Sequence, residues 1–132
     1  MNLDHVGIAV RSLEAALPRW TSLLGGTVTP PEAVPSQQVR VVFVGSGSAR
    51  IELLEPTAPE SAVGRFLERR GEGMHHVAFK VPSVEAQLAG LRAQGVRLVD
   101  HTARPGAGGH RVGFAHPSGF GGVLVEFVEG SE

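Results

Sequence analysis

The chain has 132 residues, a formal net charge of −1 and no cysteine. This length suits one domain with a sizeable core, and the near-zero charge gives no reason to expect a nucleic-acid partner. The lack of cysteine excludes disulfides and thiolate metal sites. No apolar run approaches the ~20 residues of a membrane-spanning helix, and no signal peptide is visible. We therefore expect a cytoplasmic protein without a membrane or nucleic-acid partner.

Apolar periodicity and turn residues predict the succession strand, helix and three strands twice along the chain. A serine, Ser12, is suited to cap the first helix, and Gly25-Gly26 ends it. Prolines weaken the strand that follows this helix. In chain order, we expect strands at 3–10, 27–34, 38–44, 49–55, 74–81, 96–100, 110–115 and 123–128, and helices at 13–24, 61–70 and 83–94.

The second half of the chain repeats the first. His76 lies 71 residues after His5 in a closely similar strand. Glu126 lies 74 residues after Glu52, because three extra residues precede the last strand. Modules of about 65 residues would be marginal alone, so we expect them to share a core. The sequence thus predicts one domain over 1–132, with module 1 at about 1–56, a linker at about 57–73 and module 2 at about 74–130.

Strand alternation places four polar residues on the face away from the helices: His5, Glu52, His76 and Glu126. Taken singly, such a glutamate is usually solvated, and a histidine on a strand is more often structural than a ligand. The repetition favours a different interpretation, because two-fold pseudo-symmetry would bring equivalent strands together. Two imidazoles and two carboxylates suit a divalent ion such as cobalt, zinc, nickel, manganese or iron.

The sequence resembles the vicinal oxygen chelate superfamily, which includes glyoxalase I, extradiol dioxygenases and bleomycin-resistance proteins. Within it, the chain is most similar to the methylmalonyl-CoA epimerase family. The linker with its double histidine is the most characteristic segment. The segments that carry the resemblance are DHVGIAV at 4–10, IELLEP at 51–56, FLERRGEGMHH at 66–76 and GVLVE at 122–126. The resemblance implies an α+β fold of two tandem βαβββ modules that form one U-shaped, curved, eight-stranded mixed sheet around a metal.

The resemblance also implies a function. The expected activity is metal-dependent epimerisation of methylmalonyl-CoA, or of a close acyl-CoA, by α-proton transfer through a metal-stabilised enolate. It implies a homodimer, with cobalt the first choice of metal and zinc, manganese and nickel as alternatives. His5, Glu52, His76 and Glu126 match the family's metal ligands, and Glu126 is also the expected proton-transfer residue. His75 faces the opposite side of its strand, so we expect it to be structural.

Two departures from the family bear on the substrate. The family's second glutamate is expected within 35–39, where Ser36 stands, and Ser118 replaces a lysine that often follows the His-Pro of the last hairpin. A serine is not a base near neutral pH without help, and Glu32 reaches the site only if the loop before it folds inward. The alternatives are a glyoxalase I-type lyase or isomerase acting on a hemithioacetal, and a non-catalytic bleomycin-resistance-like binding protein. A binding protein has no reason to keep four ligands.

Overall fold

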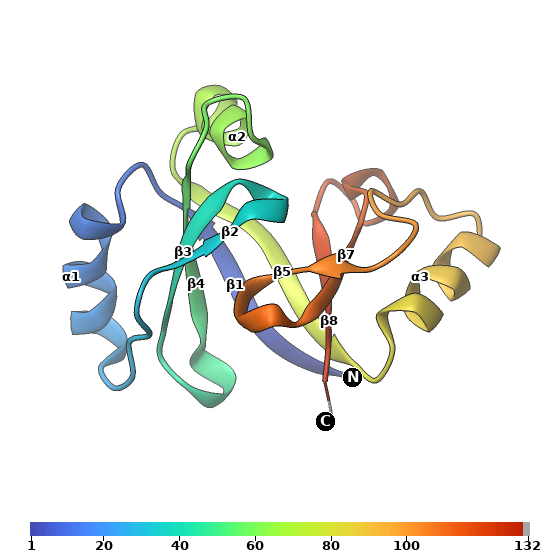
Figure 1. The fold of residues 1–132 in the computed structure, drawn as a ribbon, viewed down its shortest axis with the longest axis horizontal. Helices are drawn as coiled ribbons and strands as arrows, with labels where there is room; N and C mark the ends of the chain where they lie inside the picture. Colours follow the sequence, from blue (N-terminus) through green and yellow to red (C-terminus); the bar gives the residue numbers. More distant parts are fainter. Residues whose placement is uncertain (131–132) are drawn as a thin grey trace. The chain divides into compact units, whose positions relative to one another are not determined.

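The computed structural model describes residues 1–130. Contacts divide them into two compact units, which we call the N-terminal unit (His5–His75) and the C-terminal unit (residues 1–4 with the described residues from 76 onward). The elements are drawn in Figure 1. They are β1 (Asn2–Ala9), α1 (Leu13–Leu24), β2 (Glu32–Val34), β3 (Val39–Val44), β4 (Ile51–Pro56), α2 (Ala62–Arg70), β5 (Gly73–Val81), α3 (Val84–Ala93), β6 (Arg104–Pro105), β7 (Arg111–Ala115) and β8 (Val125–Glu129). The prediction of a single shared domain with the stated module limits stays a prediction.

The two units repeat one strand plan. In the N-terminal unit the strand order is β2-β3-β4-β1, and in the C-terminal unit it is β6-β7-β8-β5. The pairs β1–β4 and β5–β8 are parallel, whereas the other neighbours within each unit are antiparallel. Each set of strands is therefore mixed. None of the helices among residues 1–130 has the length and apolar character needed to cross a membrane.

Helix α1 begins and ends where the sequence predicts. The Ser12 hydroxyl accepts a hydrogen bond from the Ala15 N–H at 3.1 Å, which satisfies one of the unpaired donors of the first turn. At the other end, Gly25 has a φ of 64°, a conformation that glycine adopts without steric cost. Pro18 lies inside the helix without ending it.

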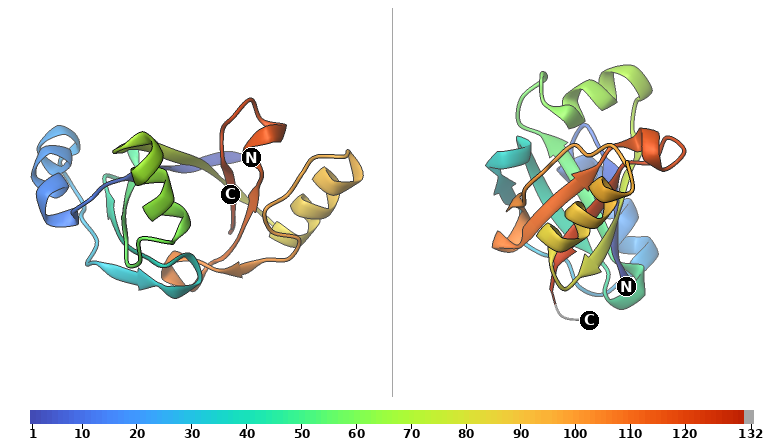
Figure 2. Two further views of the ribbon diagram at one scale, coloured as in Figure 1. Left: turned by 90° about the horizontal axis from the view of Figure 1, so that it is seen from above. Right: turned by 90° about the vertical axis from the view of Figure 1, so that its right-hand side faces the viewer.

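Each unit has its own apolar core between its helix and its strands. Helix α1 contacts β3 and β4, and α3 contacts β7 and β8, as the two views of Figure 2 show. The buried core of the N-terminal unit consists of Ile8, Val10, Leu13, Val42, Val44 and Leu53. That of the C-terminal unit consists of Val81, Val84, Leu88, Leu98, Ala115, Val125 and Phe127. These are the helix-facing sets that strand alternation predicts, so the opposite strand faces remain for polar residues.

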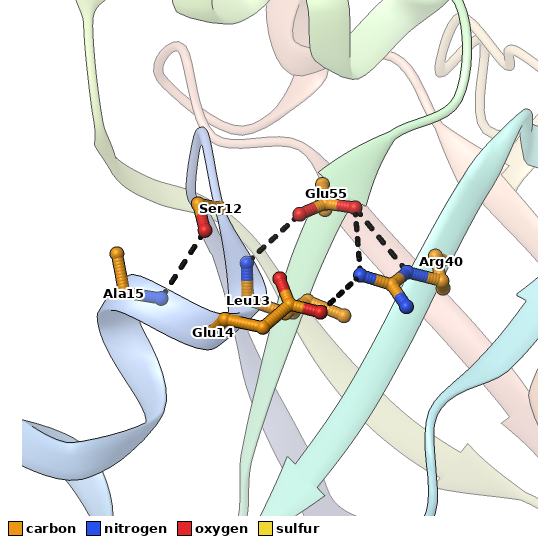
Figure 3. A network of polar contacts seen from close by, with 6 residues as sticks. All are labelled: Ser12, Leu13, Glu14, Ala15, Arg40 and Glu55. Atoms are coloured by element: carbon orange, nitrogen blue, oxygen red, sulfur yellow. Dashed lines mark hydrogen bonds and ion pairs between the residues drawn. The ribbon is translucent and has the colours of Figure 1, made fainter.

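An ionic network, which we call the helix clamp, joins the start of α1 to the strands β3 and β4 (Figure 3). Arg40 donates to Glu14 Oε1 at 2.8 Å and to Glu55 Oε1 at 3.1 and 3.2 Å. The other oxygen of Glu55 accepts the N–H of Leu13 at 2.9 Å. A carboxylate at a helix N-terminus also interacts favourably with the helix dipole. The clamp therefore fixes α1 on the end of β4.

The C-terminal unit contains the same clamp with equivalent residues. Glu129 Oε1 accepts the N–H of Val84, the first residue of α3, at 3.0 Å. Arg111 donates to Glu85 Oε1 at 2.6 Å, and its Nε lies 3.6 Å from Glu129 Oε2. The duplication therefore preserves an interaction between residues that are far apart in each module.

The strand predicted at 96–100 is wrong. Leu98 forms only an isolated bridge with Ala115, and the edge strand of the unit is β6, a few residues later. The reason is that Asp100 attaches to β7 through its side chain: Oδ2 accepts the Phe114 N–H at 2.9 Å. In addition, the N–H groups of Val99 and Asp100 share one acceptor, the carbonyl of Phe114. A regular ladder would need separate acceptors.

The strand predicted at 27–34 is shortened to β2 for a related reason. Thr29 Oγ1 accepts the N–H of Phe43 at 2.9 Å, as Asp100 does for the equivalent Phe114. Pro30 and Pro31 follow, and proline has no N–H to offer a ladder. Regular pairing of β2 with β3 therefore begins only at Glu32.

We expect the helix clamp to make stability depend on pH. The hydrogen bond from Arg40 lowers the pKa of Glu14 below its ordinary value of 4.5. A lowered pKa in the folded state adds stability above the unfolded-state pKa, and this is lost as the pH falls through the folded-state pKa. Glu14→Gln should therefore reduce the free energy of unfolding slightly at pH 7, and the difference from wild type should shrink as the pH falls below 4.5 and through the folded-state pKa.

Urea unfolding at pH 7 to 3 measures this difference. The control is Glu68→Gln, at an exposed position of α2. A Glu14→Gln deficit that is the same at both ends of the pH range would contradict the role assigned to the ionised carboxylate.

Candidate metal centre

A buried histidine–glutamate pair lies across β1 and β4 in the N-terminal unit. His5 Nε2 is 3.2 Å from Glu52 Oε1, and the two residues are only 4% and 5% exposed. The parallel register places Gly7 opposite Glu52, so no bulky side chain separates the glutamate from the histidine two residues earlier. The alternative that this glutamate is solvated is therefore wrong.

An equivalent pair lies across β5 and β8 in the C-terminal unit. His76 Nε2 is 3.1 Å from Glu126 Oε1, and the residues are 3% and 4% exposed. Here Ala78 lies opposite Glu126, in the register position that Gly7 has in the other unit. Each unit therefore buries one imidazole against one carboxylate, held by a parallel strand pair.

A phenylalanine supports each histidine. The ring of Phe43 meets His5 edge to face, with centroids 5.3 Å apart and planes at 83°. In the other unit, Phe114 meets His76 at 5.8 Å and 86°. Edge-to-face packing of this kind restricts the rotation of the imidazole. Both phenylalanines follow from the 71-residue repeat, which is the signal by which sequence reasoning could have found them.

An arginine covers each of these phenylalanine rings. The guanidinium carbon of Arg50 lies 3.9 Å from the centroid of Phe43, and that of Arg104 lies 5.2 Å from the centroid of Phe114. The Nε of Arg104 is also 3.3 Å from Asp100 Oδ1. Sequence reasoning missed both arginines, because the repeat does not place arginine at equivalent positions. Each arginine therefore places a positive charge over the ring that packs against the histidine of its unit.

The four paired residues have the chemistry of a metal-binding set. Among residues 1–130, a metal ion could be held by His5, Glu52, His76 and Glu126, each of which offers one ligand atom. Neutral imidazole nitrogens and carboxylate oxygens suit zinc-like and cobalt-like ions, and two carboxylates would balance a divalent charge. The donor set therefore fits the divalent ion that the sequence predicts.

The other residues singled out in the sequence lie outside the two pairs. The ring of His75 packs against Phe66 of α2 at 5.1 Å, in agreement with a structural role. Ser36 lies in a single 3-10 turn, Pro35–Gln37, and is exposed. Ser118 donates its N–H to His116 Nδ1 at 3.0 Å, so it holds a turn together rather than supplying a charge. Glu32 is the first residue of β2 and is exposed.

Comparisons with known proteins agree with this geometry. A model of the Glyoxalase/Bleomycin resistance protein/Dioxygenase superfamily matches residues 4–114. The mitochondrial methylmalonyl-CoA epimerase of Bos taurus is 39% identical over 96% of this chain and 73% of its own length. An ethylmalonyl-CoA/methylmalonyl-CoA epimerase of Cereibacter sphaeroides is 37% identical over 96% of both chains.

Solved structures give the same result. Methylmalonyl-CoA epimerase from Mycobacterium tuberculosis matches with a TM-score of 0.90 and 39% identity, covering 99% of this chain and 89% of that one. A methylmalonyl-CoA epimerase in complex with methylmalonyl-CoA and NH4+ matches with a TM-score of 0.89 and 37% identity, covering 98% and 94%. The predicted α+β, glyoxalase-like fold of paired βαβββ modules is therefore confirmed.

We expect each histidine–glutamate pair to be strongly coupled in the metal-free protein. The cycle His5→Phe, Glu52→Met and their double variant should give a coupling free energy of about 1.5–3 kcal/mol, because each single substitution leaves a buried polar group beside an apolar side chain. The cycle with His76→Phe and Glu126→Met should give a similar value. Urea unfolding in the presence of a chelator measures both. Single-variant costs that add to within about 0.5 kcal/mol would contradict the pairing.

Proposed function

This chain belongs to the Glyoxalase/Bleomycin resistance protein/Dioxygenase superfamily, and we propose that it is a metal-dependent epimerase of methylmalonyl-CoA or of a close acyl-CoA. The observation that carries the proposal is the buried histidine–glutamate pair in each unit, at 3.2 and 3.1 Å. The chain that contains these pairs matches epimerases along almost its whole length. A protein that only sequesters a ligand would have no use for two such buried pairs.

We propose that the two pairs together bind one divalent ion through His5, Glu52, His76 and Glu126. Burial supports this proposal, since a carboxylate removed from water is costly unless a cation or donor compensates it. A divalent ion bound there would supply Lewis-acid chemistry at the thioester carbonyl of the substrate. The edge-to-face contacts of Phe43 and Phe114 would keep the two imidazoles oriented.

We assign one proton transfer to Glu126. Its carboxylate lies on the strand face away from the apolar core, because its neighbours Val125 and Phe127 belong to that core. Its Oε1 also lies 3.1 Å from His76 Nε2, a contact that restricts where the carboxylate lies. A positioned carboxylate can take a proton from the carbon between a thioester and a carboxylate, or return one. The homodimer, the cytoplasmic location and the choice of cobalt as native metal stay predictions.

The metal proposal predicts about one divalent ion per chain. His5→Ala and His76→Ala should each lower metal affinity by more than the roughly 10–100-fold that is typical for loss of a residue behind a ligand. Elemental analysis after equilibrium dialysis measures this loss. The control is His101→Ala, at an exposed position. Full metal affinity in His76→Ala would contradict the proposed ligand set.

The epimerase proposal predicts a strong effect of Glu126→Gln on turnover. Glutamine keeps an oxygen donor but cannot take up the substrate proton, so kcat should fall by about 10²–10⁴-fold while metal affinity falls modestly. Epimerisation followed by polarimetry or a coupled assay measures this, with Glu68→Gln as the matched control. If metal-loaded wild type does not exchange the α-proton of either methylmalonyl-CoA isomer, the epimerase proposal is wrong. The glyoxalase I-type lyase or isomerase is then the function to test next.

A further inference from the structure

The proposed epimerisation needs a second proton-transfer group besides Glu126. Inverting a stereocentre requires that a proton leave one face of the carbon and that another arrive on the opposite face. Ser36, at the position where the resemblance implies a second glutamate, is exposed on a turn and has no acidic or basic group that works near neutral pH. The second group must therefore come from elsewhere in the chain.

The carboxylates of the N-terminal unit can be sorted by their surroundings. Glu14 and Glu55 belong to the helix clamp on the helix-facing side. Glu72 accepts the backbone N–H of Arg11 at 2.8 Å. Glu60 lies in a turn, and Glu68 lies on the exposed side of α2. The sheet face on which Glu32 lies follows from strand register, because Glu32 is the first residue of β2.

Strand register places Glu32 on the same face as the His5–Glu52 pair. β2 is antiparallel to β3, and Glu32 lies opposite Val41. Directly opposed residues point to the same side of a sheet, and so do residues two apart on one strand. Glu32 therefore shares a face with Val41 and Phe43, and Phe43 packs against His5. The intervening Val42 belongs to the core on the other face.

The C-terminal unit shows that a side chain at this register position reaches the ring beside the histidine. Its counterpart there is Arg104, which lies opposite Val112 as Glu32 lies opposite Val41. The guanidinium carbon of Arg104 is 5.2 Å from the centroid of Phe114, the ring that packs against His76. Adjacent strands are about 4.8 Å apart, so Glu32 on β2 lies about 10 Å from β4.

We propose that Glu32 is the second proton-transfer residue of the epimerase, an inference that rests on the proposed function. For one isomer, the Glu32 carboxylate takes the α-proton, so that the C–H bond breaks, an O–H bond forms and the electron pair passes into the enolate of the thioester. Protonated Glu126 then donates its proton to the opposite face and becomes a carboxylate. For the other isomer the two residues exchange roles. Because Glu32 is exposed, solvent can reset its protonation state between turnovers.

The test is α-proton exchange in D2O, measured separately by NMR for each purified methylmalonyl-CoA isomer with metal-loaded enzyme. Glu32→Gln should slow exchange of one isomer by about 10²-fold or more and leave that of the other within about threefold of wild type. Epimerisation should be lost in both directions, since each direction needs both groups. Glu126→Gln should show the opposite isomer preference. Metal content of Glu32→Gln should equal that of wild type, and the matched control is Glu60→Gln.

Each other outcome has a defined meaning. If Glu32→Gln exchanges both isomers at wild-type rates, or slows both equally, the assignment of Glu32 is wrong. If Ser36→Ala slows exchange of one isomer while Glu32→Gln does not, the serine has the role instead and the proposal is overturned. If wild type exchanges neither isomer, the proposed function itself fails, which is a separate result.

Discussion

The structure depends on giving each of two buried carboxylates a polar partner that offsets its loss of contact with water. Glu52 and Glu126 lie almost without solvent access, where an unpaired charge is costly. Each is placed against a histidine by a parallel strand pair whose opposing residue is glycine or alanine, so the two groups approach closely. A larger residue at Gly7 or Ala78 would separate histidine from glutamate. The small residues of β1 and β5 are therefore as important to this arrangement as the histidines and glutamates.

The strands that carry these glutamates are anchored on their opposite faces. On β4, Glu52 faces the histidine while Glu55, three residues later, faces α1 and accepts its first N–H. On β8, Glu126 faces His76, and Glu129 accepts the N–H of Val84, the first residue of α3. The period-two alternation of a strand makes this division possible, since residues three apart point to opposite sides. The helix clamp thus holds the strand that positions the buried carboxylate.

The two units share the residues that support the buried histidine–glutamate pairs, and they differ in the charge of one residue on the edge strand. Both units keep the histidine, glutamate, supporting phenylalanine and helix clamp. They differ in charge at the register position opposite Val41 or Val112, which is Glu32 on β2 and Arg104 on β6. An acidic residue in one unit and a basic residue in the other cannot perform the same task.

The sequence by itself determined the features that depend on short-range periodicity. Alternation along each strand, the serine caps and the 71-residue repeat gave the element order, the two cores and the four polar residues of the centre. Tertiary structure decided which strands pair and in which register. It showed that the strand predicted at 96–100 is replaced by the side-chain bond of Asp100, that Arg40 joins Glu14 to Glu55, and that Glu32 faces the same side as His5. These outcomes depend on partners 14 to 26 residues away or on another strand, whose positions no local pattern specifies.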